Sequence, residues 1–473
     1  MAQRRIADDL SARRIIGFAC NQGFVFFLFY MGANRFMPIG TFPFERADLF
    51  CSLAFMVVGF TVMRVVPIHV RDALFSRPLL YIYAVIIAAG SLVFDAFPQA
   101  GPYLVIPEGA MIGIPVAFLL TAWGRTFGRT GTSVAVCEVF IGSLVGALVC
   151  LAFSVIDSQF ALVALRILPL ASVVNIDVPA SREPAGRTAA EIPSETARLS
   201  LKILTGTTMF GLAMGLLETY KTDPGAAAAP HYAMSMLVFG AFLIGSLSLL
   251  LSDGFGRGAS LNKAYRLAIF LFMLGIMCVP WSPVADSVMP GESFALAGYL
   301  GLEAVLISLF MILAHVAAVD ASVTFSLGFS ALFAGELLGL LLANVIDAFQ
   351  ATTATPYGVV VLAGTLALLS YIFLFTERDF DELSEIATVT DAFEDTCAAI
   401  TERYKLSKRE SEILAYALRG RTSERIASEL TISKSTVETH LRRIYGKTGV
   451  HGRQELLDLG EATTKELAQH AHV

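Results

Sequence analysis

Residues 432–447 read ISKSTVETHLRRIYGK, and this stretch decides how the C-terminal part of the chain folds. Ser433 is a typical helix N-cap residue. Val437, Leu441 and Ile444 follow at steps of four and three, which is the spacing of one face of an α-helix. The other faces carry basic and hydroxyl side chains. The stretch therefore predicts a helix with one buried stripe, whose remaining surface suits DNA phosphates and base edges.

Two shorter helices are predicted just before this stretch. Ser407 and Glu410 have the spacing of a capping box, which starts the first helix, and Gly420 marks its end. Thr422 is the expected N-cap residue of the second helix. A helix, a tight turn and a basic helix in this order are typical of a helix-turn-helix. We therefore predict a small four-helix domain over residues 401–473.

The segment from Leu406 to Glu455 resembles the LuxR-type output domain of bacterial transcription regulators. The likeness is dense and ungapped over residues 406–414, 420–427, 432–447 and 450–455. It implies that the outward positions of the third helix contact double-stranded DNA. The candidate DNA-binding residues are Lys434, Ser435, Thr436, Glu438, Thr439, Arg442, Arg443 and Lys447. The resemblance also implies a homodimer, paired through the fourth helix, which begins at Arg453.

Side-chain chemistry divides these candidates by role. The expected phosphate contacts are the long cations Lys434, Arg443 and Lys447. Arg442 can bond guanine through two hydrogen bonds and Glu438 can accept one from cytosine, so these two, with Thr439, are the expected base readers. Many relatives carry Lys in place of Glu438, which should lower the non-specific affinity of this domain for DNA.

The rest of the chain has the composition of a membrane protein. Of its 473 residues, 55% are hydrophobic and 16% charged, and the mean hydropathy is +0.67. Soluble proteins carry about 25% charged residues. A bilayer-spanning helix needs about 20 apolar residues, and we find about twelve such runs before residue 376. They are approximately residues 15–32, 47–66, 79–97, 103–123, 134–153, 160–176, 199–220, 232–251, 264–281, 293–316, 323–346 and 357–375.

The predicted fold is all-α: a polytopic helical membrane bundle of six plus six transmembrane helices, followed by the small helix-turn-helix domain. We predict a transmembrane sensor domain over residues 1–376, an acidic linker helix over 377–400 and the LuxR-type domain over 401–473. The halves of the sensor domain are about 15–176 and 199–375, joined by a cytoplasmic loop at 177–198. Most loop Arg and Lys residues share one face when the N-terminus is inside. An even span count then places both termini in the cytoplasm, which predicts a multi-pass protein of the bacterial inner membrane.

Six helices, a longer loop and six more helices resemble the major facilitator superfamily, whose members enclose a central cavity between two halves. Residues 253–257 (DGFGR) are similar to part of that family's cytoplasmic loop motif. The corresponding residues 66–71 (VPIHVR) do not match it, which argues against transport-type gating more than against the fold.

Ionisable side chains at membrane depth are costly and are therefore candidates for function. The candidate ligand-binding residues are Glu108, Glu138, Arg166, Glu218, Glu303 and Glu336. A cavity lined by them would suit an amine or another polar small molecule, with Arg166 available for a carboxylate, and abundant aromatic residues would suit an aromatic ligand equally well. The alternative is that Glu and Arg side chains from different helices pair with each other and hold the bundle together.

Residues 377–395 are strongly acidic, and their apolar positions have helical spacing. Such a helix either shields the basic DNA-binding face or serves as a connector or dimerising stalk. The sequence contains no Gly-rich phosphate loop, His-Glu-x-x-His motif or serine elbow. We therefore predict no enzyme activity, no catalytic residue, no metal and no cofactor.

The combined features predict a membrane-bound one-component transcription regulator, in which the bundle senses an unidentified small-molecule ligand and controls DNA binding by the C-terminal domain. The main alternative is a transporter with a fused regulatory domain. A third possibility is a bundle that only anchors the regulator in the lipid bilayer, although an anchor has no use for costly buried charges.

Overall fold

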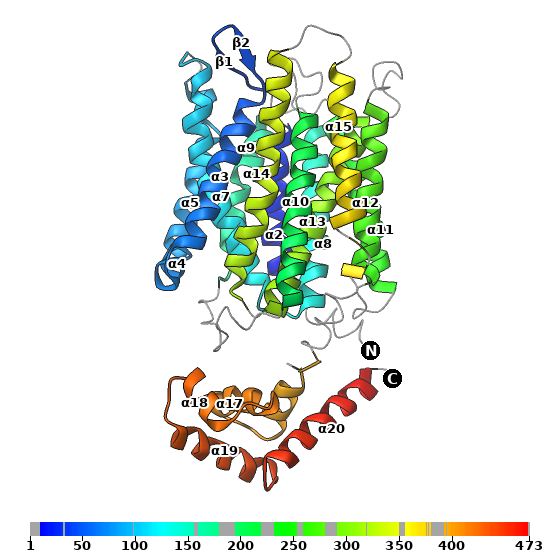
Figure 1. The fold of residues 1–473 in the computed structure, drawn as a ribbon. Helices are drawn as coiled ribbons and strands as arrows, with labels where there is room; N and C mark the ends of the chain where they lie inside the picture. Colours follow the sequence, from blue (N-terminus) through cyan, green and yellow to red (C-terminus); the bar gives the residue numbers. More distant parts are fainter. Residues whose placement is uncertain are drawn as a thin grey trace.

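The structure, a computed structural model, is described here for residues 10–31, 34–97, 99–155, 159–178, 194–218, 231–252, 259–279, 291–317, 319–349, 355–374, 376, 378–379, 392–393 and 395–471. These residues are helical or connecting apart from one short hairpin. They form a long helical bundle and a small C-terminal domain (Figure 1). The prediction of an all-α fold is confirmed.

The first half of the bundle consists of helices rich in apolar residues, since a backbone in lipid must satisfy its own hydrogen bonds. Its elements are α2 (Ala12–Phe26), the π-helix η1 (Phe27–Met31), the hairpin strands β1 (Met37–Ile39) and β2 (Phe42–Phe44), α3 (Ala47–Val65), α4 (Ile68–Leu74), α5 (Arg77–Gly90), α6 (Val93–Ala96), η2 (Pro102–Leu104), α7 (Val105–Phe127), α8 (Thr132–Val155) and α9 (Gln159–Asn175). The hairpin lies at the end of the bundle farthest from the C-terminal domain (Figure 1), and we call this the outer end.

The second half of the bundle has the same character, and one apolar core runs through both halves. Its elements are α10 (Ser194–Glu218), α11 (Tyr232–Ser252), α12 (Ala259–Cys278), α13 (Gly291–Ala317), α14 (Ala321–Ala348), α15 (Thr355–Leu369) and the π-helix η5 (Ser370–Leu374).

Each of the predicted apolar runs contains a helix, but the count of six plus six spans is not established. Within the described residues, nine helices are long and apolar enough to cross a membrane, or up to ten if the bent pair α4–α5, with its 58° break, is one span. Helices α9 and α15 have only 17 and 15 residues. Several predicted features lie outside the described residues: the loop motif at 253–257, most of the loop at 177–198 and most of the linker at 377–394.

The closest helix pairing joins α10 to α14 through glycines on both helices. Gly211 and Gly215 of α10 face the backbone carbonyl oxygens of Leu332 and Glu336, and a Cβ atom at either glycine would overlap them. Gly335 and Gly339 of α14 meet the backbone of α10 in the same way. Each helix therefore carries a Gly-x-x-x-Gly pair, which lets two helix backbones approach closely in a membrane.

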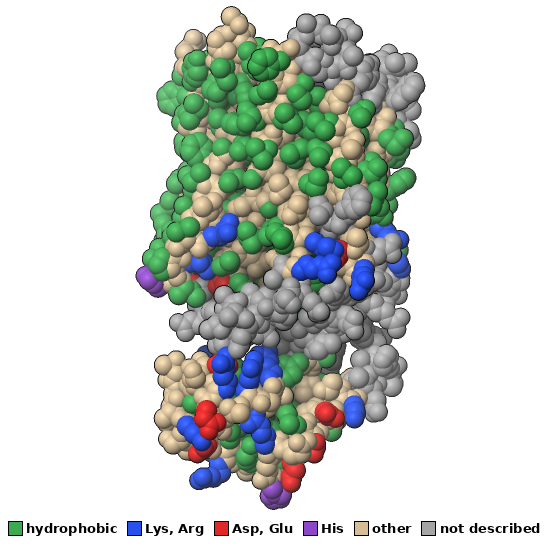
Figure 2. Space-filling view, in the orientation of Figure 1, with side chains coloured by type: hydrophobic (Ala, Val, Ile, Leu, Met, Phe, Trp, Pro, Cys, Tyr) green, Lys and Arg blue, Asp and Glu red, His purple; other side chains and the backbone are tan. Residues whose placement is uncertain are grey.

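Charge is distributed unevenly along the bundle. Figure 2 shows that the visible face is mainly hydrophobic, and that its Lys and Arg side chains gather at the end nearest the C-terminal domain. This asymmetry agrees with the basic-residue pattern from which the topology was predicted.

The C-terminal domain is built from α17 (Lys408–Leu418), α18 (Ser423–Glu429), α19 (Lys434–Thr448) and α20 (Arg453–Ala471), and it has an apolar core separate from that of the bundle. The predicted capping box is confirmed, because the Ser407 hydroxyl accepts from the Glu410 amide and the Glu410 carboxylate accepts from the Ser407 amide at 2.7 Å. Thr422 caps α18 and Ser433 caps α19, also as predicted.

An ion pair joins the first and third of these helices. Lys447 Nζ donates to Glu410 Oε2 at 2.6 Å, and the Glu410 side chain is only 4% exposed. The hydrogen bond from Lys447, followed by that from the Ser407 amide, lowers the pKa of Glu410 to about 2. The pair stabilises the domain at neutral pH, since the ionised carboxylate is favoured in the folded state.

The glycine pairing gives the first prediction. Gly215→Ala and Gly335→Ala should each lower the melting temperature of the purified protein in detergent, because the added methyl group forces α10 and α14 apart at a cost of about 1–3 kcal/mol. The control is Gly358→Ala in α15, where an added Cβ meets no atom within 4 Å. An unchanged melting temperature in both test variants would contradict the close pairing.

The second prediction concerns acid stability. Glu410→Gln retains a side chain that can complete a capping box, but removes the charge paired with Lys447. Because the folded pKa of Glu410 is about 2 against an ordinary 4.5, the contribution of Glu410 is complete above about pH 4.5 and is lost as the pH falls towards about 2. We expect the variant to unfold more easily in urea at neutral pH, by about 1–2 kcal/mol after allowing for the partly exposed lysine, and to lose this acid dependence.

The measurement is urea unfolding of a fragment beginning at residue 392, followed by circular dichroism. Glu461→Gln is the matched control, since Glu461 and Lys465 are about three-quarters exposed and their charges are 3.9 Å apart. Equal stability of wild type and Glu410→Gln both at neutral pH and near pH 2 would show that the buried pair contributes nothing.

Candidate functional site

Helix α19 presents all the predicted DNA-contact residues on its exposed faces. The eight exposed side chains are Lys434, Ser435, Thr436, Glu438, Thr439, Arg442, Arg443 and Lys447. Val437, Leu441 and Ile444 form the buried stripe, as the sequence predicts. The helix therefore has one face fixed in the domain core and the rest directed to solvent.

Two of the predicted phosphate contacts already have partners inside the domain. Lys447 pairs with Glu410 of α17. Lys434 pairs with Glu424 of α18, and its ammonium lies 3.7 Å from a carboxylate oxygen of Glu438. These pairs tie both ends of α19 to the neighbouring helices, so either lysine would have to exchange a carboxylate for a phosphate.

Arg442 and Arg443 differ from these lysines. Both are exposed, and neither forms an ion pair within the described part of the chain. The hydroxyl of Thr439 donates to the Ser435 carbonyl at 2.8 Å, so it is engaged in the helix itself. The two arginines are thus the cations of α19 most available to an approaching nucleic acid.

The last part of the predicted linker belongs to the C-terminal domain. Residues 395–403 are helical, and Ile400 is fully buried in the domain core. This helix packs on α20 through the hydroxyls of Thr396 and Thr464, 2.8 Å apart, and through the ion pair of Arg403 with Glu466. The helix crosses the boundary that the sequence suggested at residue 401, because the buried Ile400 requires it.

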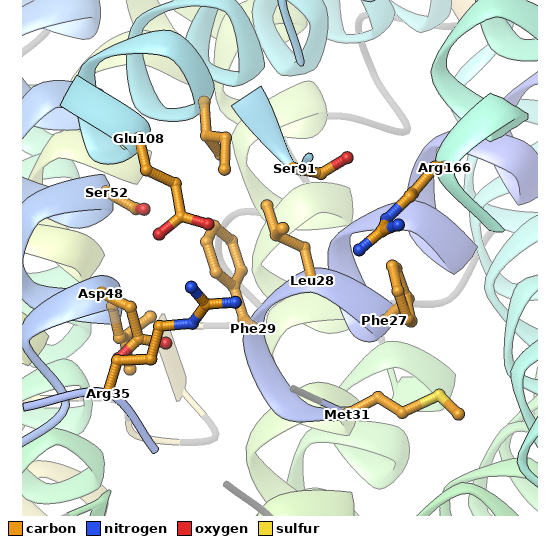
Figure 3. Close-up of a pocket in the computed structure, with 12 residues that line it drawn as sticks. Phe27, Leu28, Phe29, Met31, Arg35, Asp48, Ser52, Ser91, Glu108 and Arg166 are labelled. Atoms are coloured by element: carbon orange, nitrogen blue, oxygen red, sulfur yellow. The ribbon is translucent and has the colours of Figure 1, made fainter. Parts of the chain in front are cut away.

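The outer end of the first half contains a cavity of about 280 Å³. Its lining is part apolar, from η1 and α3, and part charged. The charged side chains are Arg35, Asp48, Glu108 and Arg166 (Figure 3). Of the six predicted ligand-binding residues, the structure places Glu108 and Arg166 together here.

Several polar atoms of this cavity form no hydrogen bond within the described residues. Glu108 is only 7% exposed, and its Oε2 atom forms no hydrogen bond within the described residues. The same holds for Asp48 Oδ1 and Arg166 Nε. The Nη2 atom of Arg166 is engaged, since it pairs with Asp95 at 2.6 Å. Arg35 stacks on the ring of Phe94, 3.6 Å from its centroid.

The other four predicted ligand-binding residues lie elsewhere in the bundle. Glu138 is fully buried and forms a two-pronged ion pair with Arg14 near the inner end. Glu336 accepts a hydrogen bond from the Tyr299 hydroxyl at 2.7 Å. Glu303 is buried, with one oxygen unbonded in the described part of the chain.

Glu218, at the outer end of α10, pairs with Arg46 at 3.1 Å, and both side chains are almost completely buried. Arg46 Nη2 also donates to the Phe29 carbonyl at 2.8 Å. The backbone of Arg46 is left-handed, with φ of 52°, which strains a non-glycine residue. Nothing in the sequence around Arg46 distinguishes it from an ordinary loop cation. Its burial could not be seen in the local pattern, because its partner is 172 residues away.

A second contact beside this pair also joins the two halves. Asn344 of α14 accepts a hydrogen bond from the Glu45 amide at 2.8 Å and donates to the Glu45 carbonyl at 3.2 Å. Residues 45 and 46, which directly follow the hairpin, are thus fixed to α14 and α10 of the second half. The outer ends of the halves are held together at this point.

Aromatic rings fill the space between α3 and α14. Phe60 of α3 stacks on Phe329 and Phe333 of α14, with ring centroids 5.7 and 6.2 Å apart. Phe310 of α13 meets Phe329 edge-on at 5.8 Å. The interface between the two halves is therefore packed with large apolar side chains at this level.

The inner end of α10 is joined to the beginning of the linker. Lys202 Nζ donates to both carboxylate oxygens of Asp379, at 2.8 and 3.1 Å. Partial burial opposes ionisation of Asp379, but the hydrogen bonds from Lys202 and Thr376 outweigh it and hold its pKa below the usual value. Helix α10 thus carries a buried ion pair at its outer end and a partly buried one at its inner end.

Comparison with known proteins assigns the C-terminal part of the chain. Residues 404–459 match the family described as "Bacterial regulatory proteins, luxR family". The uncharacterized response regulatory protein YgeK of Escherichia coli K12 is 39% identical over 84 residues, which cover 17% of this chain and 57% of YgeK. The Fimbriae Z protein of the same strain is 45% identical over 53 residues, 11% of this chain and 25% of that protein. The chain therefore spans little more than half the length of the first relative and a quarter of the second.

Comparison with solved structures assigns the fold of the bundle. A bacterial homologue of the iron transporter ferroportin matches with a TM-score of 0.50 and 10% identity, over 81% of this chain and 99% of that chain. The major facilitator superfamily transporter FucP matches with a TM-score of 0.47 and 12% identity, over 75% of this chain and 98% of that chain. The C-terminal domain is therefore a LuxR-type helix-turn-helix domain, fused to a multi-pass membrane domain with a transporter-like fold.

Proposed function

We propose that this chain is a membrane-bound one-component transcription regulator. Its membrane domain binds a small molecule and thereby controls the binding of double-stranded DNA by the C-terminal domain. The protein lies in the bacterial inner membrane with both termini in the cytoplasm, where DNA is accessible. The basic side chains at the end of the bundle nearest the C-terminal domain support this orientation.

The observation that carries the proposal is the way α10 is held at both ends. Glu218 at its outer end pairs with Arg46, beside the cavity. Lys202 near its inner end pairs with Asp379, at the start of the linker. Lys202 and Glu218 are 16 positions apart, which corresponds to about 24 Å along an α-helix. One rigid element therefore connects the outer cavity region with the segment that leads to the C-terminal domain.

The close pairing of α10 with α14 supports this connection, because it favours movement of the two helices together. Because the glycines place the backbones of α10 and α14 in direct contact, a small separation of the two helices would lose this close packing. A change at the outer end would therefore move α10 and α14 together, and would reach the linker through Lys202. Ligand must bind one arrangement of the halves more tightly than the other, since equal affinity for both shifts no population.

On the DNA side, the eight exposed residues of α19 supply the contacts, and a homodimer formed through α20 would read a two-part operator. Arg443, Lys434 and Lys447 hold phosphates, and Arg442, Glu438 and Thr439 read bases. The internal pairs of both lysines leave Arg443 as the main phosphate contact at first encounter.

A transporter with a fused regulatory domain is the second candidate, because the fold of the bundle is shared with transporters. The aromatic packing of Phe60 against Phe329 and Phe333 argues for the sensor, since these rings fill the space between the halves. Uptake of candidate ligands into vesicles containing the purified protein separates the two. Net accumulation would favour the transporter, whereas binding without accumulation is expected.

The third prediction tests the connection through α10. Asp379→Asn removes the charge that holds the linker to Lys202, so it should change promoter occupancy in the absence of inducer, measured by genome-wide occupancy mapping at equal protein levels. The matched control is Asp177→Asn, which disrupts an exposed ion pair with Arg77. Occupancy and ligand response that match the wild type in Asp379→Asn would remove the basis of the proposal.

The fourth prediction tests the DNA contacts. Arg443→Ala should weaken binding to all DNA sequences alike and reduce the slope of log affinity against log salt by about 1, because one phosphate contact is lost. Arg442→Ala should cost about 1–3 kcal/mol at the preferred site and relax its sequence preference. Fluorescence anisotropy with a bound promoter fragment and a random duplex measures both effects. A uniform loss in Arg442→Ala would reassign that residue to the backbone.

A further inference from the structure

We propose that the outer cavity of the first half binds a small zwitterion, a molecule with one ammonium and one carboxylate group on a compact apolar body. Its ammonium group lies between Glu108 and Asp48, and its carboxylate lies against Arg166. The regulatory consequence of this binding rests on the proposed function, but the binding itself does not.

The cavity contains polar atoms that form no hydrogen bond within the described residues. Buried polar groups without hydrogen bonds are costly, and ionic ones more so. Yet the cavity holds a nearly buried carboxylate oxygen of Glu108, a carboxylate oxygen of Asp48 and the Nε–H of Arg166, all without hydrogen bonds in the described residues. Two acceptors and one donor are thus left for a ligand.

Charge is distributed asymmetrically across the cavity. Figure 3 shows Glu108 and Asp48 on one side and Arg166 on the other. The positive charge of Arg35 balances one of the two carboxylate charges on this side, so one negative charge remains there. Arg166 pairs with Asp95 through Nη2 only, so its Nε–H is left to donate to an anion. A ligand with a cation at one end and an anion at the other satisfies both sides.

Metal cations and inorganic anions fit this cavity poorly. Two guanidinium groups in the cavity repel a metal cation, and the described residues contain no group of three or more metal-ligating side chains. Two carboxylates repel an inorganic anion. A volume of about 280 Å³ lies just below the range of about 300–1,000 Å³ for drug-sized ligand sites, so it suits only a small molecule. Phe27, Leu28 and Phe29 form an apolar wall that suits a hydrocarbon side chain.

The cavity is also well placed to act on the outer contact between the halves. Asp48 is two residues from Arg46, whose guanidinium pairs with Glu218 of α10. An ammonium group bound at Asp48 would neutralise a carboxylate that also attracts the Arg46 guanidinium. Arg46 would then favour its pairing with Glu218. The π-helical segment η1, which forms one wall, is a kind of helix irregularity common at functional sites.

The test measures binding to the purified full-length protein in lipid nanodiscs by isothermal titration calorimetry. The probes are L-leucine, L-phenylalanine and gamma-aminobutyrate, each with its matching amine and its matching acid: isoamylamine and isocaproate, phenethylamine and hydrocinnamate, butylamine and butyrate. At least one zwitterion should bind at least about tenfold more tightly than both of its analogues, a difference of about 1.4 kcal/mol. This comparison needs no variant.

The variants assign the two ends of the ligand. Glu108→Gln should weaken the binding of the zwitterion and of the amine about tenfold and leave the affinity for the acid unchanged. Arg166→Gln should abolish the preference for the zwitterion over the amine. The matched control is Asp347→Asn, an exposed carboxylate at the outer end of α14, which should bind as the wild type does. Melting temperatures of all variants identify any that fail to fold.

Some results would overturn the proposal. These are an amine that binds the wild type as tightly as its zwitterion, a folded protein that binds no zwitterion at millimolar concentration, or Glu108→Gln and Arg166→Gln variants that bind as the wild type does. Zwitterion binding without any change in promoter occupancy would support the cavity assignment and defeat the regulatory function. If promoter occupancy responds to Asp379→Asn but the protein binds no zwitterion, the regulatory function is supported and the cavity assignment is overturned.

Discussion

The buried pair of Arg46 and Glu218 is the interaction on which the organisation of the membrane domain depends. It joins a strained loop residue of the first half to the outer end of α10 in the second half, out of contact with water. Removing one member of such a pair leaves an unpaired buried charge, a loss of about 3–5 kcal/mol. The neighbouring amide contact between Asn344 and Glu45 fixes the same loop to α14. The outer ends of the two halves are therefore joined by directional bonds, and not by apolar contact alone.

A second constraint acts along the length of the bundle. The reciprocal glycine pairs bring the backbones of α10 and α14 into direct contact, so the two helices form one packed unit. This unit carries the buried ion pair at one end and the Lys202–Asp379 pair at the other. Under the proposed function, this arrangement supplies a physical route between the outer cavity and the linker, in addition to the covalent connection.

Local patterns predicted the C-terminal domain well, because its caps and its buried stripe are set by residues three or four positions apart. The capping box at Ser407 and the inward positions Val437 and Leu441 illustrate this. The apolar runs predicted the helices of the bundle, but not how many of them cross the membrane. The grouping of the candidate ligand-binding residues could be foreseen only in part: Glu108 and Arg166 share a cavity, whereas Glu138 and Glu218 pair with arginines from distant parts of the chain. Such pairings depend on tertiary contacts that spacing cannot reveal. The glycine pairs were visible in the sequence as Gly-x-x-x-Gly and were overlooked.

The ion pair between Lys202 and Asp379 limits how far the C-terminal domain can lie from the bundle. Only 15 residues lie between Asp379 and Asp395, and residues 395–403 form the helix that packs on α20. Even a fully extended chain of that length reaches no more than about 55 Å. This tether keeps the C-terminal domain close to the bundle, so under the proposed function an operator must itself lie near the bilayer to be bound. Promoter location in the cell, as well as promoter sequence, would then select which genes such a protein can govern.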